Sequence, residues 1–259
     1  MMVAHKARLV ALVMVSGIVA GCRNAPRPEI EAGLANSVPA DAVVLCGLDY
    51  QRLRASAAYG KLPAATVALL EPLRPAAYLL VAFNGRDYLL LGRGPFGKAP
   101  AGATLLAPDL AVAGSEDAVR AATAQHGRGS AGSALPGLAE KLASGHEIWM
   151  VAMGNATLPV TGNAQNLNGL LHQTEYTTVV VHVTDGIEME ATGVCATSGQ
   201  AERLEGELRA MASIGAAAER RRPEIAGLLR AIQVNRQERT VRVDFRTDGA
   251  GVEQLLHLF

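Results

Sequence analysis

The sequence predicts an α+β protein made of two related halves, each a mostly antiparallel sheet with helices packed on it. Short apolar runs of strand length alternate with amphipathic stretches of helical period. Two pairs of such runs are joined by Asn84-Gly85 and by Asp185-Gly186, dipeptides that are typical of hairpin turns. The order of strand, helical or loose segment, hairpin and helix occurs on both sides of a Gly-rich stretch at 126–137. For the second half we also consider a ferredoxin-like arrangement.

Composition bounds the class of protein. The chain has 259 residues, 24 Lys and Arg against 24 Asp and Glu, 49% hydrophobic residues and 4% aromatic residues. This length is enough for a sizeable core, and the low charge argues against disorder. A balanced charge argues against a nucleic-acid binder, which needs a clustered basic surface.

Residues 1–21 have the features of an export signal. Lys6 and Arg8 precede an apolar run over 9–20. Twelve residues span about 18 Å as a helix, well short of the ~30 Å hydrocarbon core of a bilayer. The run therefore predicts a signal-peptide core rather than a membrane span.

The residues that end this run, Val19-Ala20-Gly21-Cys22, resemble the lipobox of bacterial lipoproteins. The resemblance covers residues 1–22 only, and the rest of the chain is assigned to no characterised family. It implies that the Cys22 thiol receives diacylglycerol, that the chain is cut before Cys22, and that the new amine is acylated, with palmitate among the chains. It also implies a body that faces the periplasm. Arg23 stands where an inner-membrane retention signal would have Asp, which favours the outer membrane.

A tether is expected over 22–38, where Pro26, Pro28 and Gly33 interrupt any period. Seventeen residues reach at most about 56 Å, so the body stays close to the bilayer. We expect this tether to contribute no core residues, so that a body beginning at Val38 folds alone.

The first half covers 39–125. Apolar runs predict strands over 42–48, 77–83, 87–91 and 110–113. Asp49 and Ser115 are expected to cap helices over 50–58 and 116–125, and Pro63 suits the first turn of a short helix that ends near 70.

A linker is expected over 126–137, and the second half covers 138–259. Its strands are predicted over 148–153, 176–183, 187–194, 231–235 and 240–245. Thr197 and Gln200 form a capping box for a helix with Ala201, Leu204, Leu208 and Met211 on its buried face. A second helix is expected over 224–230, and Asp248 is expected to cap a closing helix.

Gly92-Arg93-Gly94-Pro95-Phe96-Gly97-Lys98-Ala99 matches a phosphate-binding loop up to its last residue. Ala99 replaces the Ser or Thr that would bind magnesium, and Pro95 removes a backbone N–H. Pro100 and Gly102 oppose a following helix. The stretch is therefore interpreted as a turn that leaves a strand, and no nucleotide or other cofactor is expected.

Cys46 and Cys195 are the two cysteines of the body, and both lie in apolar runs. An exported protein meets oxidising conditions, so a disulfide between them is allowed; the alternative is that both are small core residues. The histidines of the body show no metal-binding spacing, so no metal site is expected. Trp149 is expected in the core. Glu219-Arg220-Arg221-Arg222 is read as a solvated helix end, with contact to lipid phosphates as the alternative.

These observations favour a non-catalytic, lipid-anchored envelope protein that acts as a binding, scaffold or assembly module with another envelope protein as its partner. No catalytic residue is assigned. Two alternatives stay open. A periplasmic hydrolase would need two or more of five dispersed residues to converge in a pocket: Asp49, Asp109, His146, His172 and His182. A carrier of lipid or another hydrophobic ligand would need a dry cavity between the sheet and its helices.

Overall fold

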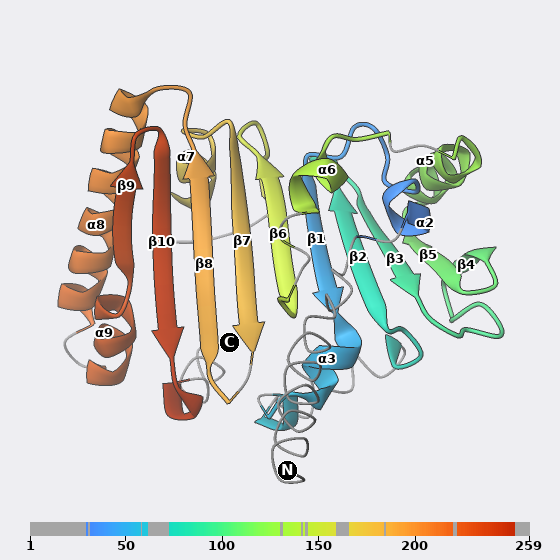
Figure 1. Ribbon diagram of the computed structural model, residues 1–259, viewed down its shortest axis with the longest axis horizontal. Coiled ribbons are helices and arrows are strands. Elements are labelled where there is room, and N and C mark those ends of the chain that lie inside the picture. The colour runs from blue at the N-terminus through green and yellow to red at the C-terminus, as the bar shows by residue number, and fades with distance from the viewer. Residues whose placement is uncertain are drawn as a thin grey trace, which may run out of the picture.

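The computed structural model describes residues 30, 32–57, 59–61, 73–129, 132–140, 142, 145–158, 166–183, 185–219 and 222–251. They form one antiparallel sheet of ten strands with helices on both faces (Figure 1). The strands are β1 Val44–Asp49, β2 Tyr78–Phe83, β3 Tyr88–Arg93, β4 Thr104–Ala107, β5 Leu110–Gly114, β6 Ile148–Met153, β7 Tyr176–Val183, β8 Ile187–Val194, β9 Gln233–Gln237 and β10 Thr240–Thr247. The α+β class is confirmed.

The strand order shows the repeat. It is β4-β5-β3-β2-β1-β6-β7-β8-β10-β9, so both halves run outward from the centre in the same sequence of strands. The two halves join in one sheet because β1 pairs with β6, with Cys46 opposite Met150. A ferredoxin-like order is not found among the described strands of the second half. There β6, β7 and β8 are sequential neighbours, whereas a ferredoxin-like unit places its first strand between two later ones.

The described helices are α2 Ala32–Ala35, α3 Tyr50–Ala55, the 3₁₀ turn η1 Tyr59–Lys61, α5 Glu116–Gly127, α6 Leu135–Ala139, α7 Asn166–Leu171, α8 Ser198–Ala218 and α9 Pro223–Arg230. Three of them, α3, α5 and α8, begin at a side-chain cap, whereas α6 and α9 begin with a proline in the first turn. The Asp49 carboxylate accepts from the Arg52 amide, and the Ser115 hydroxyl accepts from the Ala118 amide. Thr197 and Gln200 form the predicted capping box of α8.

Several local expectations are corrected. β4 and α7 were not expected, and part of the expected linker is helical because α5 extends to Gly127 and α6 begins at Leu135. The two central residues of the β2–β3 turn lie one position later than the expected Asn84-Gly85. The Asn84 side chain accepts from the amides of Arg86 and Asp87, which makes Gly85, at φ +97°, the first central residue. The expected helix over 63–70 lies outside the described residues. Of the closing helix, residues 249–251 are described and helical, and the Gly251 amide donates to the Asp248 carboxylate at 2.9 Å, as expected for the cap.

The tether is shorter than expected. Ile30, Leu34 and Val38 are buried in the largest hydrophobic cluster, and Leu34 is only 1% exposed. The Ser37 hydroxyl lies 2.9 Å from Nδ1 of His126 in α5. Residues 30–38 therefore belong to the folded body. The segment from Cys22 to Ile30 spans at most about 28 Å, which is half the reach expected from the sequence.

The two faces of the sheet are covered differently. We call the side with α2, α5 and α6 the α6 face and the other side the α7 face. In the first half the α6 face is the main core. Trp149 lies there, 1% exposed, with its Nε1–H donating to the Tyr78 hydroxyl at 2.6 Å. Its indole packs over Gly47, where a Cβ would overlap the ring.

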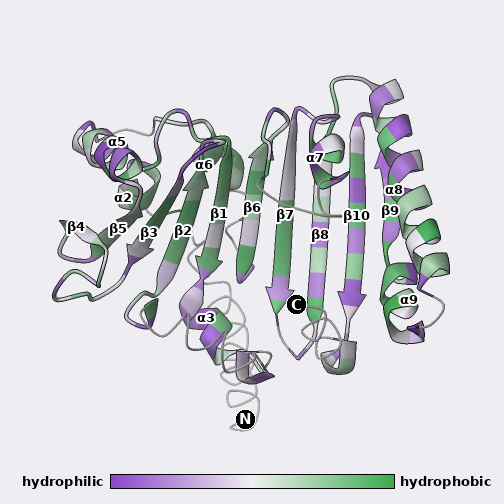
Figure 2. Cartoon of the chain, turned by 180° about the vertical axis from the view of Figure 1, so that it is seen from behind, coloured by the Kyte–Doolittle hydropathy of each residue, from purple (hydrophilic) through white to green (hydrophobic). Residues whose placement is uncertain are grey.

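In the second half the α6 face is polar. Glu188, Glu190 and Thr192 alternate along β8 with residues of the α7 face. Arg242 of β10 pairs with Glu190 across the sheet. Figure 2 shows this as alternating bands on β10, whereas β1, β2 and β6 are mainly hydrophobic. The apolar surface of the second half therefore lies on the α7 face.

Candidate functional site

The α7 face has an apolar row that crosses nine strands. Strand register places Cys46, Met150, Val179, Ala191 and Val243 in one line on this face. The line continues through Val81, Leu90 and Ala113 in the first half and Val234 at the edge. No charged side chain interrupts it, so this face offers a continuous apolar floor.

A cavity of about 310 Å³ lies between this floor and two helices. Met150, Val179, Met189, Ala191, Gly193, Val241 and Val243 form the floor, Leu167, Leu170 and Leu171 come from α7, Leu204 and Leu208 come from α8, and Leu158, Thr174 and Thr177 complete the lining. The small side chain of Ala191 in β8 leaves space that a larger one would fill, whereas Gly193 is closely packed, since a Cβ there would lie 3.0 Å from the Thr174 side chain.

Hydrogen bonds hold α7 over the cavity. The Asn168 side chain bonds both the amide and the carbonyl of Leu158, at 2.8 and 3.0 Å. Gln173, just after α7, donates to Glu207 of α8 at 2.6 Å. A six-residue helix is too short to be stable alone, so these contacts and the packing of its leucines fix its position.

The lining offers almost no polar group to a ligand. Thr174 donates to the Leu171 carbonyl at 2.7 Å, and its hydroxyl lies 3.1 Å from that of Thr177. Leu167 is 45% exposed on α7. A ligand in this cavity would gain mainly by removing hydrocarbon surface from water, which is the chemistry of an alkyl chain.

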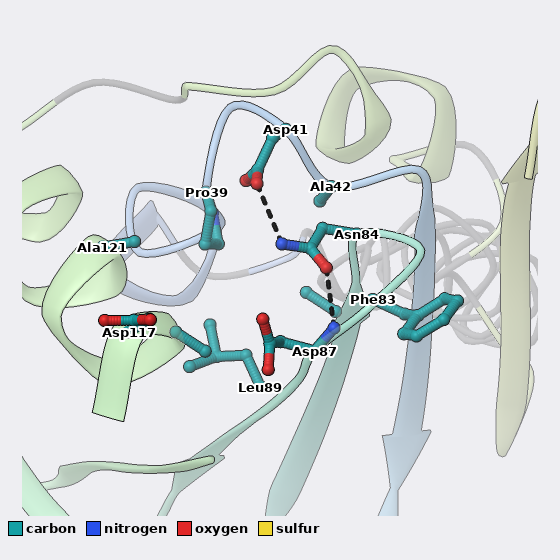
Figure 3. A pocket seen from close by; sticks show the side chains of 11 residues that line it. Pro39, Asp41, Ala42, Phe83, Asn84, Asp87, Leu89, Asp117 and Ala121 are labelled. Carbon is teal, nitrogen blue, oxygen red and sulfur yellow. Dashed lines mark hydrogen bonds between the residues drawn. The ribbon is translucent and has the colours of Figure 1, made fainter. Parts of the chain in front are cut away.

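A second cavity, of about 210 Å³, lies at the β2–β3 turn and the start of α5 (Figure 3). Asp41, Asp87 and Asp117 line it around an apolar base that includes Phe83 and Leu89. Asn84 donates to Asp41 at 2.9 Å, and Asp117 pairs with Arg120 of α5. Within the described ranges no group of three or more His, Cys, Asp or Glu has a geometry that could hold a metal ion.

Of the five residues weighed for a hydrolase, three lie around one carboxylate that the sequence analysis did not single out. Glu147 is buried, and its Oε2 accepts from Nδ1 of His182 at 2.8 Å and from the Val183 amide at 2.8 Å. Arg52 of α3 lies 3.3 Å from Oε1. The Asp49 amide donates to the Glu147 carbonyl, and the rings of His146 and His182 are 6.5 Å apart.

The contacts of Glu147 connect α3, β6 and β7, so the cluster has a structural explanation. Neither cavity described above includes its members. Asp109 is far along the chain in the β4–β5 turn and pairs with Arg93 at 3.0 Å. Nε2 of His172 lies 3.1 Å from the Ala156 carbonyl oxygen, beside α7. This distribution gives the hydrolase alternative no support. The sequence signal that could have indicated this cluster was Glu147, an acidic residue that directly follows His146 and directly precedes a strand.

Cys46 and Cys195 are free thiols, so the disulfide that the sequence allowed is not formed. Cys46 lies in β1 and Cys195 directly follows β8, with β6 and β7 between them. Three strand spacings alone separate them by about 14 Å, twice the Cα separation that a disulfide tolerates, and Cys195 lies four residues along the strand direction from Ala191, which is in register with Cys46. Burial raises the pKa of Cys46 to about 11, and burial and the charge of Glu175 raise the pKa of Cys195.

Of the stretch Gly92–Ala99, Gly92 and Arg93 end β3 and the remainder is the loop that leaves it, with no helix following. The Gly97 φ is +61°, and a Cβ at Gly94 would overlap the backbone of Pro75. Lys98 is exposed. The site residue Cys22 and the signal peptide lie outside the described residues, as do Arg220 and Arg221. No helix in the described part of the chain is long and apolar enough to cross a bilayer.

No family model matches the chain, and no curated protein is similar to it in sequence. Solved structures with a similar fold do exist. Crystal form III of TP0453 superposes with a TM-score of 0.52 over 87% of this chain and 98% of that chain, at 8% identity. Crystal form IV of TP0453 gives 0.51 over 86% and 95%, at 11% identity. At this identity the likeness concerns the fold alone.

Proposed function

We propose that this chain is a lipid-anchored protein of the bacterial envelope whose body holds a hydrocarbon chain in the cavity between α7, α8 and the sheet. The cavity itself is the observation that supports this most. It is the space between sheet and helices that a carrier of hydrophobic ligands requires, and its lining is aliphatic on three sides. The sequence favoured a binding, scaffold or assembly module with another envelope protein as its partner, and a carrier of a hydrophobic ligand was one of its two alternatives. The cavity supports that alternative best.

The anchor supports the same function. Lipidation at Cys22 would keep the body at the source of acyl chains, and the short segment before Ile30 limits its distance from the bilayer to about 28 Å. Removing Lys6 and Arg8 with the signal leaves two more acidic than basic residues. General attraction to anionic lipid is therefore weak, and the acyl chains on Cys22 would hold the protein at the membrane. The outer membrane and a body in the periplasm remain our proposal for its location.

The test is uptake of a fluorescent fatty acid, cis-parinaric acid, by a chain that begins at Arg23. We expect saturable binding with one site. The Ala191→Phe variant fills the floor of the cavity and should abolish uptake, because the ring takes the volume of the ligand. Thr192→Phe is the matched control, since it places the same ring on the other face of the same strand and should leave uptake unchanged.

A second variant protects the test from a failure of folding. Leu167→Glu introduces a charge at an exposed position of the wall, so the fold should tolerate it. A bound alkyl chain would strip water from this carboxylate, which is unfavourable, so the affinity should fall. Undiminished uptake by both Ala191→Phe and Leu167→Glu, with native Trp149 emission, would overturn the proposed function.

A further inference from the structure

The apolar cavity contains one pair of hydrogen-bonding side chains. Among its described lining residues only Thr174 and Thr177 carry a hydroxyl, and none carries an amide or a charged group. Thr174 follows α7 and is 9% exposed, and Thr177 lies in β7 on the floor. A Cβ at Gly193 would lie 3.0 Å from Cγ2 of Thr174 and 3.8 Å from Oγ1 of Thr177. Glycine at this position therefore leaves the pair uncovered at the floor of the cavity.

The protons of both hydroxyls are already used within the protein. The Thr174 hydroxyl donates to the Leu171 carbonyl at 2.7 Å, so it has no second proton to give. The Thr177 oxygen lies 3.1 Å from the Thr174 oxygen, so Thr177 is the donor in that contact. Within the described part of the chain no other residue donates to Oγ1 of Thr177. The pair can therefore accept a hydrogen bond from a ligand but cannot donate one.

The volume of the cavity limits the length of the ligand. A cavity of about 150 Å³ holds benzene, so about 310 Å³ has room for about twelve carbon atoms. α8 contributes Leu204 and Leu208, which are one turn apart. Met211, which the sequence placed on the same buried face, is 41% exposed and does not line the cavity. This space fits a single alkyl chain rather than the two chains of a phospholipid.

The contact that joins α7 to α8 is acidic. Glu207 of α8 accepts from Gln173, the residue before Thr174, at 2.6 Å. An anionic head group beside Thr174 would meet this carboxylate and two hydroxyls without a free proton, which is unfavourable on both counts. A neutral hydroxyl avoids the repulsion and supplies the proton that Thr177 can accept.

We propose that the ligand is a single alkyl chain of about twelve carbons that carries a hydroxyl, and that this hydroxyl donates to Oγ1 of Thr177. The inference rests on the proposed function, since it names the ligand of the same cavity. A hydroxyl without a partner is costly in a hydrocarbon environment, and Thr177 provides that partner. A fatty acid can still enter tail first with its carboxylate in water, so cis-parinaric acid remains a suitable reporter of occupancy.

The experiment is displacement of cis-parinaric acid from the chain that begins at Arg23, which keeps every described residue. Dodecanol and undecyl methyl ether are isomers, and only the alcohol has an O–H group. The ratio of their Kd values is compared between the unsubstituted chain and Thr177→Val, so that the different hydration of the two ligands cancels. We expect the preference for the alcohol to fall about twofold to tenfold in Thr177→Val, as for the loss of one neutral hydrogen bond.

Thr178→Val is the matched control. It makes the same substitution at the next residue of β7, on the α6 face and outside the cavity, and should leave the ratio unchanged. An unchanged ratio in Thr177→Val, or an equal change in Thr178→Val, would overturn the proposal.

Thr174→Val tests the direction of the hydrogen bond within the pair. It frees the Thr177 proton, which can then be donated to the oxygen of the ether, so the ether should bind more tightly than it does to the unsubstituted chain. Normal uptake of cis-parinaric acid by this variant shows that α7 still closes the cavity. With uptake normal, no gain for the ether would mean that Thr177 is not the donor of the pair, and the proposal would fail.

A second pair of ligands distinguishes two sources of the hydroxyl. β-Hydroxydodecanoate and dodecanoate differ only in a hydroxyl on an acyl chain, whereas dodecanol is a free alcohol. A preference that depends on Thr177 in both pairs supports a hydroxylated acyl chain, and one confined to the first pair supports a free alcohol. Failure of cis-parinaric acid uptake by the unsubstituted chain would refute the proposed function and this inference with it. Normal uptake with the same ratios in Thr177→Val would refute this inference alone.

Discussion

Truncation of Leu34 measures how much the segment before β1 contributes to the fold. Leu34 is 1% exposed and lies in α2, within the cluster that also holds Ile30, Val38 and Trp149. Replacing a fully buried Leu by Ala removes its transfer free energy and leaves a cavity, which costs about 2–5 kcal/mol. Against a typical total of about 5–15 kcal/mol, the loss is large.

The assay is urea unfolding of a chain that begins at Arg23, followed by the emission of Trp149. Trp149 is the single tryptophan and is packed in the same cluster as Leu34, so its emission reports on this core. For Leu34→Ala we expect about 3 kcal/mol less stability and a melting temperature lower by about 6–12 °C. Ile214→Ala removes a similar side chain at 69% exposure and should change stability by no more than about 0.5 kcal/mol.

The reasoning fails if Leu34→Ala is as stable as Ile214→Ala. That result would mean that residues 30–38 do not pack on the body in solution and that the longer tether expected from sequence is right. A chain beginning at Val38 would then fold normally, whereas we now expect it to lose much of its stability together with Ile30 and Leu34.

Three further predictions address other parts of the chain. Gly94→Ala should destabilise strongly because its Cβ would overlap the backbone, and Gly97→Ala should destabilise by about 1 kcal/mol because of its positive φ. Lys98→Ala should leave stability unchanged. Melting curves check all three variants, and saturable nucleotide binding in a titration would contradict the interpretation as a turn. Cys22→Ser should accumulate uncut precursor, whereas the unsubstituted chain should show an acylated Cys22 by mass spectrometry. Folding stability should fall above about pH 9, because burial raises the pKa of Cys46 to about 11 and the unfolded thiol loses its proton first. Cys46→Ala should make stability fall less steeply with pH, and an unchanged dependence of stability on pH would contradict this prediction.

The sign of the alkaline effect follows from which state binds the proton. The folded thiol keeps its proton up to a higher pH than the unfolded one, so its contribution is complete below about pH 9 and lost as pH rises toward 11. Tyr78 acts in the same direction, since burial raises its pKa to about 12. Two pKa units for Cys46 correspond to about 2–3 kcal/mol.

Local signals predicted the long strands and the caps. β6, β7 and β8 have the expected limits because apolar and β-branched residues fill them and Gly-containing turns bound them. The capping box of α8 was visible because both of its hydrogen bonds are local. β4 was missed because its four residues, between Gly102 and Asp109, are too few to show the alternation typical of a strand. Only its pairing with β5 makes it a strand.

The candidate site could not be predicted in the same way. α7 lies in a polar Asn- and Gly-rich stretch, and its helix depends on contacts with Leu158 and Glu207 that are distant in the sequence. The cavity depends on the register of the four strands β6, β7, β8 and β10 and on α8, so no window of sequence contains it. The available signal was the small residue Ala191 on the apolar side of β8. Its size matters only once α7 and α8 are known to lie opposite.

The stability of Ala191→Phe decides whether the cavity is a packing defect or a retained site. A larger apolar side chain at this position would bury more hydrocarbon, and filling a cavity commonly stabilises by about 0.5–2 kcal/mol. The chain nevertheless has Ala191 on this face of β8, where a β-branched residue would suit a strand better. If Ala191→Phe is more stable yet takes up no fatty acid, the small side chain of Ala191 lowers stability but keeps the binding volume open. If it is less stable, the surrounding leucines already close the space, and the cavity has too little room for an alkyl chain.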